Sequence, residues 1–418
     1  MVKLTDPALC AKCKGSRRLC GRPVCPILKR IESSIKISSL VRKRELFAAT
    51  PPSVLVGERG YPYVWLGPNV APLTGESASE YEKPEEWWGV KSLEDIIRLR
   101  SSMIFSRFRV KVTKVRDPSS SLLDLTRELA ISVKPVDAEY VFKKPPTPRL
   151  KFDGILSPIG PRAELERLSI AQNPVVPRKV DSLVEDYDVT ASEAAEELYI
   201  GGISYYHIVR IFSLGLLGLR NRRRLVPTRW AITAVDNVLG NSLLKRVKYY
   251  EPIGEVELYH SSYIGNRYVL MLVPGNWSFE MAEIWMPRSV WVRVNEPFLT
   301  VNYELYDGKP RVPGVDGGYY AIRFPVLEAL NRRRKQAIVI AIREVTPSYY
   351  APVGSWQIRE SVRRAFINKP VKFSSLEEAL KVVNKFIETP IDLIIAKSKL
   401  LKSLLLQRKL TDFLNCRR

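Results

Sequence analysis

Gln336-Ala337-Ile338-Val339-Ile340-Ala341-Ile342-Arg343 is the run of this chain that says most about its fold. It is almost entirely apolar, rich in β-branched residues and too short for an isolated helix, so it predicts a buried strand. Tyr268-Val269-Leu270-Met271-Leu272-Val273 has the same character and predicts a second one. Helices are predicted near 319–335, 357–366 and 376–387. The last third of the chain therefore predicts an α+β fold with a partly antiparallel sheet.

The rest of the chain is long enough for more than one unit. With 418 residues, 45% of them hydrophobic, it can bury a sizeable core and divide into two or three parts. A helix is predicted over 27–47, and two β-rich runs separated by Gly and Pro predict a hairpin over 53–68. Thr190-Ala191-Ser192-Glu193 is a capping box, which predicts a helix that ends at Gly201-Gly202 and is followed by a second helix over 203–214.

The chain is strongly basic, with 66 Lys and Arg against 44 Asp and Glu and a formal net charge of +22. A field of that sign attracts nucleic-acid backbones and anionic membranes alike. No apolar run has the length that spans a bilayer, and the first residues lack a secretory signal. We therefore expect a soluble, cytoplasmic protein without a membrane partner. The alternative explanation is that the charge only aids solubility or supplies ion pairs in a thermophilic protein.

Four of the five cysteines lie close together near the start of the chain. They are Cys10, Cys13, Cys20 and Cys25. Two close pairs of thiolates can surround one Zn²⁺ and leave no ligand position open, so we expect a structural zinc knuckle. An iron–sulfur cluster is an alternative, and a disulfide pair is another that a reducing cytosol disfavours. Lys14 and Arg17 would offset the charge of the thiolates or contact phosphates.

The densest internal basic run is Arg220-Asn221-Arg222-Arg223-Arg224, directly before Pro227-Thr228-Arg229-Trp230. Guanidinium groups beside an aromatic ring suit phosphate contacts and base stacking, particularly on single-stranded or distorted DNA. This segment is the leading predicted nucleic-acid site. Together with the two N-terminal cations, the predicted contact residues are Arg222, Arg223, Arg224, Arg229, Trp230, Lys14 and Arg17.

The last residues include Gln407-Arg408-Lys409-Leu410-Thr411-Asp412-Phe413-Leu414. This segment resembles the clamp-binding (PIP) box with which replication and repair proteins dock on the sliding clamp PCNA. In that resemblance Gln407 caps a polar pocket, and one helical turn presents an apolar plug formed by Leu410, Phe413 and Leu414. Many clamp partners carry a second aromatic residue at the position of Leu414, so we expect a modest affinity. Alternatively, 400–414 is the apolar face of a terminal helix.

Two internal segments and this tail together resemble a known family. The internal segments are Cys10 to Pro26 and Leu225-Val226-Pro227-Thr228-Arg229-Trp230-Ala231-Ile232-Thr233-Ala234-Val235-Asp236. The chain resembles the archaeal Nre proteins, a family associated with DNA repair, over essentially its whole length. The resemblance implies a zinc module, a large central region, a smaller C-terminal domain and a clamp box, and it supplies no agreed catalytic mechanism. The expected division is a four-cysteine module at 1–30, an N-terminal and central domain at 31–287, a C-terminal domain at 288–400 and a flexible PCNA-binding tail at 401–418.

These patterns leave open whether the chain is an enzyme. A metal-dependent nuclease or nucleotide-processing enzyme needs clustered carboxylates that hold Mg²⁺. Asp236 is the best single candidate. Glu280, Glu283 and Glu304 would join it only if the fold brings them close. The leading hypothesis is a DNA repair factor that binds damaged or single-stranded DNA and is held on the sliding clamp by its tail. The alternatives are such an enzyme delivered by the clamp, and an RNA- or ribosome-associated zinc protein.

Overall fold

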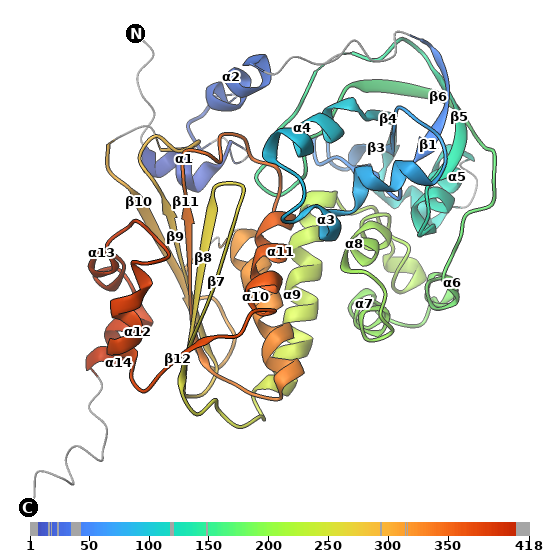
Figure 1. The fold of residues 1–418 in the computed structure, drawn as a ribbon. Helices are drawn as coiled ribbons and strands as arrows, with labels where there is room; N and C mark the ends of the chain where they lie inside the picture. The colour runs from blue at the N-terminus through green and yellow to red at the C-terminus, as the bar shows by residue number, and fades with distance from the viewer. Residues whose placement is uncertain are drawn as a thin grey trace, which may run out of the picture.

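A computed structural model of the chain describes residues 7–15, 17, 19–22, 25–34, 43–117, 121–147, 149–292, 295–313, 315 and 317–406. These residues form two six-stranded sheets with helices around and between them (Figure 1). The first sheet lies at the upper right of Figure 1, the second lies toward the left, and long helices stand between them. The predicted α+β class with a partly antiparallel sheet is confirmed.

The first sheet has the strand order β1-β5-β6-β4-β3-β2, in which β4 and β6 are parallel and the other neighbours are antiparallel. The predicted hairpin over 53–68 is confirmed as β2 and β3. Gly67 lets β3 approach β4, because a Cβ there would lie 1.7 Å from the backbone oxygen of Ser106. The strands are β1 (Glu45–Thr50), β2 (Val54–Val56), β3 (Tyr63–Val70), β4 (Ile104–Lys111), β5 (Val136–Phe142) and β6 (Arg162–Ile170). The short elements around them are η1 (Glu76–Glu82), α3 (Pro84–Trp87), α4 (Leu93–Ser102), η2 (Val112–Arg116) and α5 (Ser121–Ile131).

The second sheet contains both buried strands that the sequence predicts. The run at 268–273 lies in β8 (Asn266–Val273), and the run at 336–343 lies largely in β11 (Ile338–Val345). These strands pair antiparallel at the centre of the order β10-β9-β11-β8-β7-β12, while β11 and β9 are parallel. The outer strands are β7 (Val256–Tyr263), β9 (Ser278–Trp285), β10 (Phe298–Glu304) and β12 (Val371–Phe373).

Helices cover both faces of the second sheet, which explains why its central strands are almost continuously apolar. Leu270 and Ala341 point into the core shared with the long helices, whereas their neighbours Met271 and Ile340 point toward the C-terminal helices. The first face carries α9 (Thr228–Val247), α10 (Gly317–Arg333) and α11 (Trp356–Ala365), and the second carries α12 (Leu376–Val383), α13 (Ile391–Ile395) and α14 (Lys399–Leu406).

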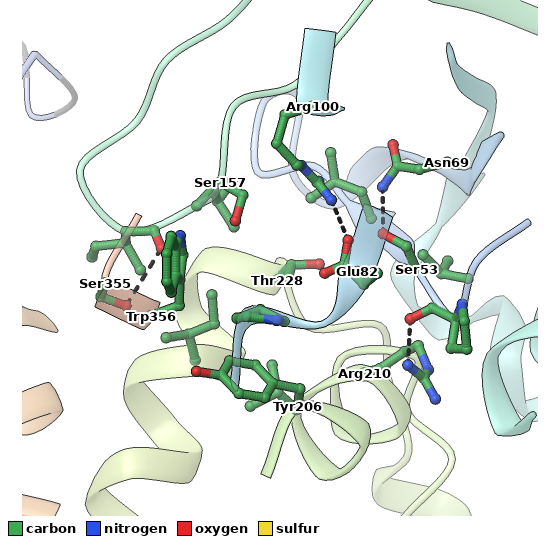
Figure 2. Close-up of a pocket in the computed structure, with 18 of the residues that line it drawn as sticks. Ser53, Asn69, Glu82, Arg100, Ser157, Tyr206, Arg210, Thr228, Ser355 and Trp356 are labelled. Atoms are coloured by element: carbon green, nitrogen blue, oxygen red, sulfur yellow. Dashed lines mark hydrogen bonds and ion pairs between the residues drawn. The ribbon is translucent and has the colours of Figure 1, made fainter. Parts of the chain in front are cut away.

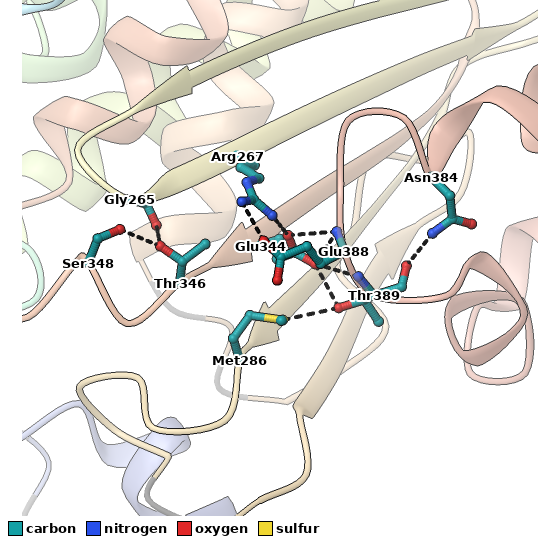
Figure 3. Close-up of polar contacts among 9 residues, drawn as sticks. All are labelled: Gly265, Arg267, Met286, Glu344, Thr346, Ser348, Asn384, Glu388 and Thr389. Carbon is teal, nitrogen blue, oxygen red and sulfur yellow. Dashed lines mark hydrogen bonds and ion pairs between the residues drawn. The ribbon is translucent and has the colours of Figure 1, made fainter.

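Two buried carboxylates attach the C-terminal helices to this sheet. Glu344 of β11 accepts hydrogen bonds from the backbone N–H of Thr389 (2.8 Å), from its hydroxyl (2.7 Å) and from Arg267 of β8 (2.9 Å), as Figure 3 shows. Glu280 of β9 accepts the N–H groups of the first two residues of α14 at 2.7 and 3.0 Å. Because both carboxylates are buried, these contacts hold the chain firmly up to its last described helix.

The helices α6 (Arg178–Glu185), α7 (Ala191–Ile200) and α8 (Tyr205–Ser213) pack below the first sheet (Figure 1). Thr190 and Glu193 form the predicted capping box, and α7 ends before Gly201 as expected. The second predicted helix is α8. Its Arg210 is buried and donates to the backbone carbonyl oxygens of Pro52, Ala130 and Ser132, so it supports the first sheet from within.

One predicted helix ends earlier than expected, and one predicted domain boundary can be placed on the fold. The helix predicted over 27–47 is confirmed in part as α2 (Pro26–Ser34) and is wrong at 45–47, because Glu45–Thr50 pairs with β5 along its whole length as β1. Tertiary pairing overrides the local helical pattern there. The boundary expected between 287 and 288 falls between β9 and β10, which pair with each other in one sheet. In the described part of the chain, no helix has both the length and the apolar character needed to cross a bilayer.

Candidate functional site

The basic run at 220–224 separates into surface and buried residues. It begins as the short helix η3 (Arg220–Arg222), and Arg222 and Arg224 are exposed. Arg223 is 3% exposed, and its guanidinium donates to three backbone carbonyl oxygens at 2.6 to 2.8 Å. Burial lowers the pKa of Arg223. The buried arginine therefore holds a loop in place, and two of the three arginines predicted here are positioned to meet a ligand.

In space, the basic run at 220–224 lies next to the segment that follows β4. The backbone N–H of Leu225 donates to the carbonyl oxygen of Val112 at 2.9 Å, and the Arg116 side chain donates to the carbonyl oxygen of Arg223 at 2.9 Å. Both bonds join the run to η2, which follows β4 without a break. The exposed arginines are thus next to one end of the first sheet.

Arg229 and Trp230 open α9 and have different surroundings. Arg229 is largely covered; its Nη1 lies 3.6 Å from Glu58 and its Nε lies 3.3 Å from Asp153. Trp230 is 46% exposed, and its ring centroid lies 5.6 Å from that of Tyr61, which is 44% exposed. Trp230 is therefore placed for stacking. The sequence does not single out Tyr61 as a binding residue, because the segment around it is marked only by Gly and Pro of the turn between β2 and β3.

Lys14 and Arg17 line a pocket that Arg229 also lines, together with Lys12 and Arg343. Its empty space amounts to about 480 Å³. Lys14 donates to Glu283 at 2.7 Å, and its ammonium group lies 5.4 Å from the ring centroid of Trp285. The structure thus brings together three of the predicted contact residues around one strongly basic pocket beside the cysteine segment.

The four cysteines line one smaller pocket. Cys10 and Cys13 lie one turn apart on α1 (Pro7–Cys13), Cys20 lies in the following loop, and Cys25 directly precedes α2. Turns at Gly15 and Gly21, with φ of 75° and 71°, return the chain toward α1. Burial raises the pKa of the Cys25 thiol, an effect that the neighbouring backbone N–H groups oppose.

Four thiols that face a common space are the donor set that zinc prefers, so the chemistry of these residues fits a zinc ion. Within the described ranges, however, no three side chains of His, Cys, Asp or Glu stand around one point as ligands do. The thiols are close enough to share a pocket, but they do not form a closed tetrahedron in this structure.

Asp236 belongs to a buried ion pair. It is 1% exposed, and its two oxygens accept hydrogen bonds from Nε and Nη2 of Arg359 at 2.9 and 2.7 Å. Burial raises the pKa of Asp236, and the guanidinium of Arg359 opposes that rise. Because both carboxylate oxygens are bonded to one guanidinium, the ion pair links α9 to α11 and has a structural role. This geometry does not favour Asp236 as a Mg²⁺ ligand.

The other three candidate carboxylates serve separate contacts. Glu280 binds the start of α14, whereas Glu283 binds Arg343 at 2.7 Å from the opposite face of β9. Glu304 of β10 is fully buried and binds Arg323 of α10 at 2.8 and 2.9 Å. The fold of the described residues therefore does not bring these groups to Asp236.

A pocket with about 720 Å³ of empty space lies where the first sheet meets α8, α9 and α11 (Figure 2). Its charged and polar groups are mostly bonded to the protein itself. Arg100 pairs with Glu82, and the Asn69 amide donates to the Ser53 hydroxyl at 2.9 Å. The lining thus joins the two halves of the fold and presents little free charge to a ligand.

The predicted clamp box, Gln407, Leu410, Phe413 and Leu414, lies outside the described residues. The stretch before it is helical: Leu400 and Leu401 of α14 are buried against the second sheet, and Leu406 at its end is exposed. The leucine-rich pattern therefore corresponds to a packed helix as far as residue 406.

Comparison with known proteins assigns nearly the whole chain. The family model described as Archaeal Nre, N-terminal, matches residues 19–292, and Archaeal Nre, C-terminal, matches residues 304–413. The DNA repair protein NreA of Archaeoglobus fulgidus is 39% identical over 385 residues, which cover 91% of this chain and 94% of the relative. NreA of Haloferax volcanii is 36% identical, with 95% and 96% covered, and the DNA repair protein NreB of Archaeoglobus fulgidus is 35% identical, with 94% and 97% covered.

No solved structure matches this chain. The assignment therefore rests on sequence. The first family model covers the first sheet, α6 to α9 and the strands β7 to β9 of the second sheet, and the second model covers α10 to α14. The chain belongs to the archaeal Nre family, whose relatives named above are DNA repair proteins.

Proposed function

We propose that this protein is a DNA repair factor that binds DNA through an exposed basic and aromatic surface and docks on the sliding clamp PCNA through residues 407–414. The observation that carries the proposal is similarity over more than nine-tenths of the chain to proteins named for DNA repair. The formal charge of +22 and the exposure of Arg222, Arg224 and Trp230 support contact with a phosphate backbone and with bases.

Docking on the clamp would make weak DNA contacts sufficient. A tail bound to a ring that encircles DNA raises the local concentration of the attached protein, so the DNA-binding surface acts at an effective concentration far above that in bulk solution. Glu280 fixes the start of α14, eight residues before Gln407. The proposed docking segment therefore follows a helix that is attached to the body of the protein.

The first test concerns the arginines. Replacing Arg222 and Arg224 together with alanine should reduce the slope of log Kd against log salt concentration by roughly 1.5 to 2, because two phosphate contacts and their released counterions are lost. Fluorescence anisotropy with a labelled duplex and a labelled single strand, each at several salt concentrations, measures the slope.

The matched control for this test removes Arg332 and Arg334 at the end of α10, where two exposed cations complement the helix dipole. That control should leave the slope unchanged. An equal slope for the Arg222/Arg224 variant and the unaltered protein would remove the run at 220–224 from the DNA interface.

We also propose that Cys10, Cys13, Cys20 and Cys25 hold one structural Zn²⁺. Support comes from the common pocket that the four thiols line and from the basic residues around it, which would stabilise thiolates. A bound Zn²⁺ would order the N-terminal module, because the segment has only short helices to hold it. The role of the metal would be structural, with no open ligand position for a substrate.

Replacing Cys13 with serine should lower the zinc content from about one ion per chain to almost none and weaken the N-terminal module, because three thiolates bind zinc poorly. Elemental analysis of the purified protein and limited proteolysis near residues 7–34 measure the two effects. Replacing Cys416, the fifth cysteine, is the control and should change neither. A brown protein that contains iron in place of zinc would contradict the proposal and favour the iron–sulfur alternative.

A further inference from the structure

We propose that the outer face of β3 and β4 is a stacking platform for single-stranded DNA, with Tyr61 and Trp230 extending it. This inference rests on the proposed function, because it names the form of DNA that the protein holds. It adds a surface on the first sheet to the arginine run, and it assigns to that surface the base contacts that phosphate binding alone does not provide.

Strand alternation separates the two faces of this part of the first sheet. The side chains of Val64 and Leu66 of β3 point inward and are fully buried, whereas Tyr63 is 48% exposed and Trp65 is half-buried. Arg109 of β4 lies directly opposite Trp65 in the antiparallel register and is exposed. The outer face of two adjacent strands is therefore made of aromatic rings and cations, while the inner face forms part of the core.

The cations lie over the rings. The guanidinium carbon of Arg107 is 4.2 Å from the ring centroid of Trp65, and that of Arg109 is 5.9 Å from the ring centroid of Tyr63. These contacts keep the cations close to the aromatic rings, so a base that stacks on an exposed ring would lie near a positive charge. Lys111, directly opposite Tyr63, adds a further exposed cation.

The platform continues beyond one end of these strands, where Tyr63 at the start of β3 pairs with Lys111 at the end of β4. At the loop between β2 and β3, the contact between Tyr61 and Trp230 adds two half-exposed rings. Beyond the end of β4, η2 binds the segment that carries the exposed Arg222 and Arg224. The basic surface predicted from the sequence and the aromatic surface found in the structure therefore meet around β4.

The nearest acids on this side are already paired or outnumbered. Glu164 of β6 lies opposite Arg107 and pairs with Lys143, and Glu58 lies near Arg229. Burial lowers the pKa of Arg162, also on β6, and the positive charges of Arg107, Arg59 and Arg149 act in the same direction, whereas Glu32 opposes them. Around Arg162 the neighbouring cations thus outnumber the acid. A polyanion is the partner that this field attracts.

Exposed rings favour a single strand over a duplex. In a duplex each base is stacked between its neighbours, and only the backbone and the groove edges reach a flat protein surface. In a single strand the base faces are open, so Trp230, Tyr61 and Tyr63 can each stack with a base while the arginines contact phosphates. The sequence of the strand should matter little, because every base has a π face.

The test measures Kd by fluorescence anisotropy for a 20-nucleotide DNA strand, the corresponding duplex and an RNA strand of the same sequence. The unaltered protein should bind the DNA strand at least tenfold more tightly than the duplex. Trp230→Ala and Tyr61→Ala should each weaken binding to the strand by roughly tenfold, the effect of losing one stacked base, and hardly change binding to the duplex. Trp230→Phe should restore most of the loss.

Tyr249→Ala is the matched control, because Tyr249 is 88% exposed and follows the opposite end of α9, roughly 30 Å from Trp230. It should leave Kd for all three nucleic acids unchanged. Equal binding of strand and duplex, unaffected by Trp230→Ala but reduced in the Arg222/Arg224 variant, would overturn the platform while DNA binding stands. Tighter binding of the RNA strand would overturn the assignment to DNA, and failure to bind any nucleic acid would overturn the proposed function as well.

Discussion

Replacing Gln407 and Phe413 with alanine is expected to abolish capture of the protein by the sliding clamp while leaving its affinity for DNA nearly unchanged. In a clamp box the glutamine and the aromatic residue enter separate pockets, and a short docking segment has few other contacts to compensate for their loss. The arginine run and Trp230 belong to other parts of the molecule, so DNA binding should not depend on the tail.

Isothermal titration calorimetry and gel filtration with the clamp of the same organism measure clamp binding. Fluorescence anisotropy with labelled DNA measures the affinity for DNA. A variant with Lys409 and Thr411 replaced by alanine is the matched control, since both residues occupy positions between the pattern-defining residues of the box. The control should bind the clamp like the unaltered protein. Clamp binding that survives the loss of Gln407 and Phe413 would refute the assignment of the tail.

Replacing Asp236 with alanine is expected to lower the free energy of unfolding by about 3 to 5 kcal/mol, because it leaves the guanidinium of Arg359 buried without its counter-charge. Arg359 is 1% exposed and lies 4.1 Å from the ring centroid of Tyr205, so water cannot replace the lost carboxylate without local rearrangement. Chemical denaturation followed by circular dichroism measures the change.

Removing the charges of both Asp236 and Arg359 distinguishes a structural ion pair from a catalytic carboxylate. A double variant, Asp236→Leu with Arg359→Met, should recover much of the lost stability, since no isolated charge is then buried. Replacing Arg311, whose pair with Asp307 is exposed, is the control and should change stability little. If Asp236→Asn kept full stability but lost a Mg²⁺-dependent cleavage of DNA that the unaltered protein performs, the structural role argued for Asp236 would be wrong.

The sequence predicted β8, β11 and the start of α7 correctly, because interactions between residues close together in the chain favour these elements. The short, β-branched apolar runs in β8 and β11 favour buried strands, and Thr190 with Glu193 closes a capping box within one turn. The incorrect helix prediction at 45–47 has the opposite cause. That segment is a strand because it pairs with β5, some ninety residues later in the chain, and no local pattern encodes the pairing.

In the candidate site, too, some residues can be identified from the sequence and others only from tertiary contacts. Composition and spacing identified the basic run, Trp230 and the cysteine cluster, because charge, aromatic character and thiol spacing are visible in the sequence. They did not separate Arg223 from Arg222 and Arg224, since the burial of Arg223 depends on the C-terminal end of α6, about forty residues earlier in the chain. They also missed Tyr61, which only tertiary structure brings to Trp230.

By itself, the sequence determined the family, the α+β class and the kinds of residue available for binding, because these follow from residue identity and local periodicity. Tertiary structure alone decided which of those residues meet a ligand. It buried Asp236 against Arg359, 123 positions away, enclosed Arg223, and brought the exposed ring of Tyr61 into contact with that of Trp230. The physical reason is that burial and charge pairing arise from contacts between distant parts of the chain, which local patterns do not specify.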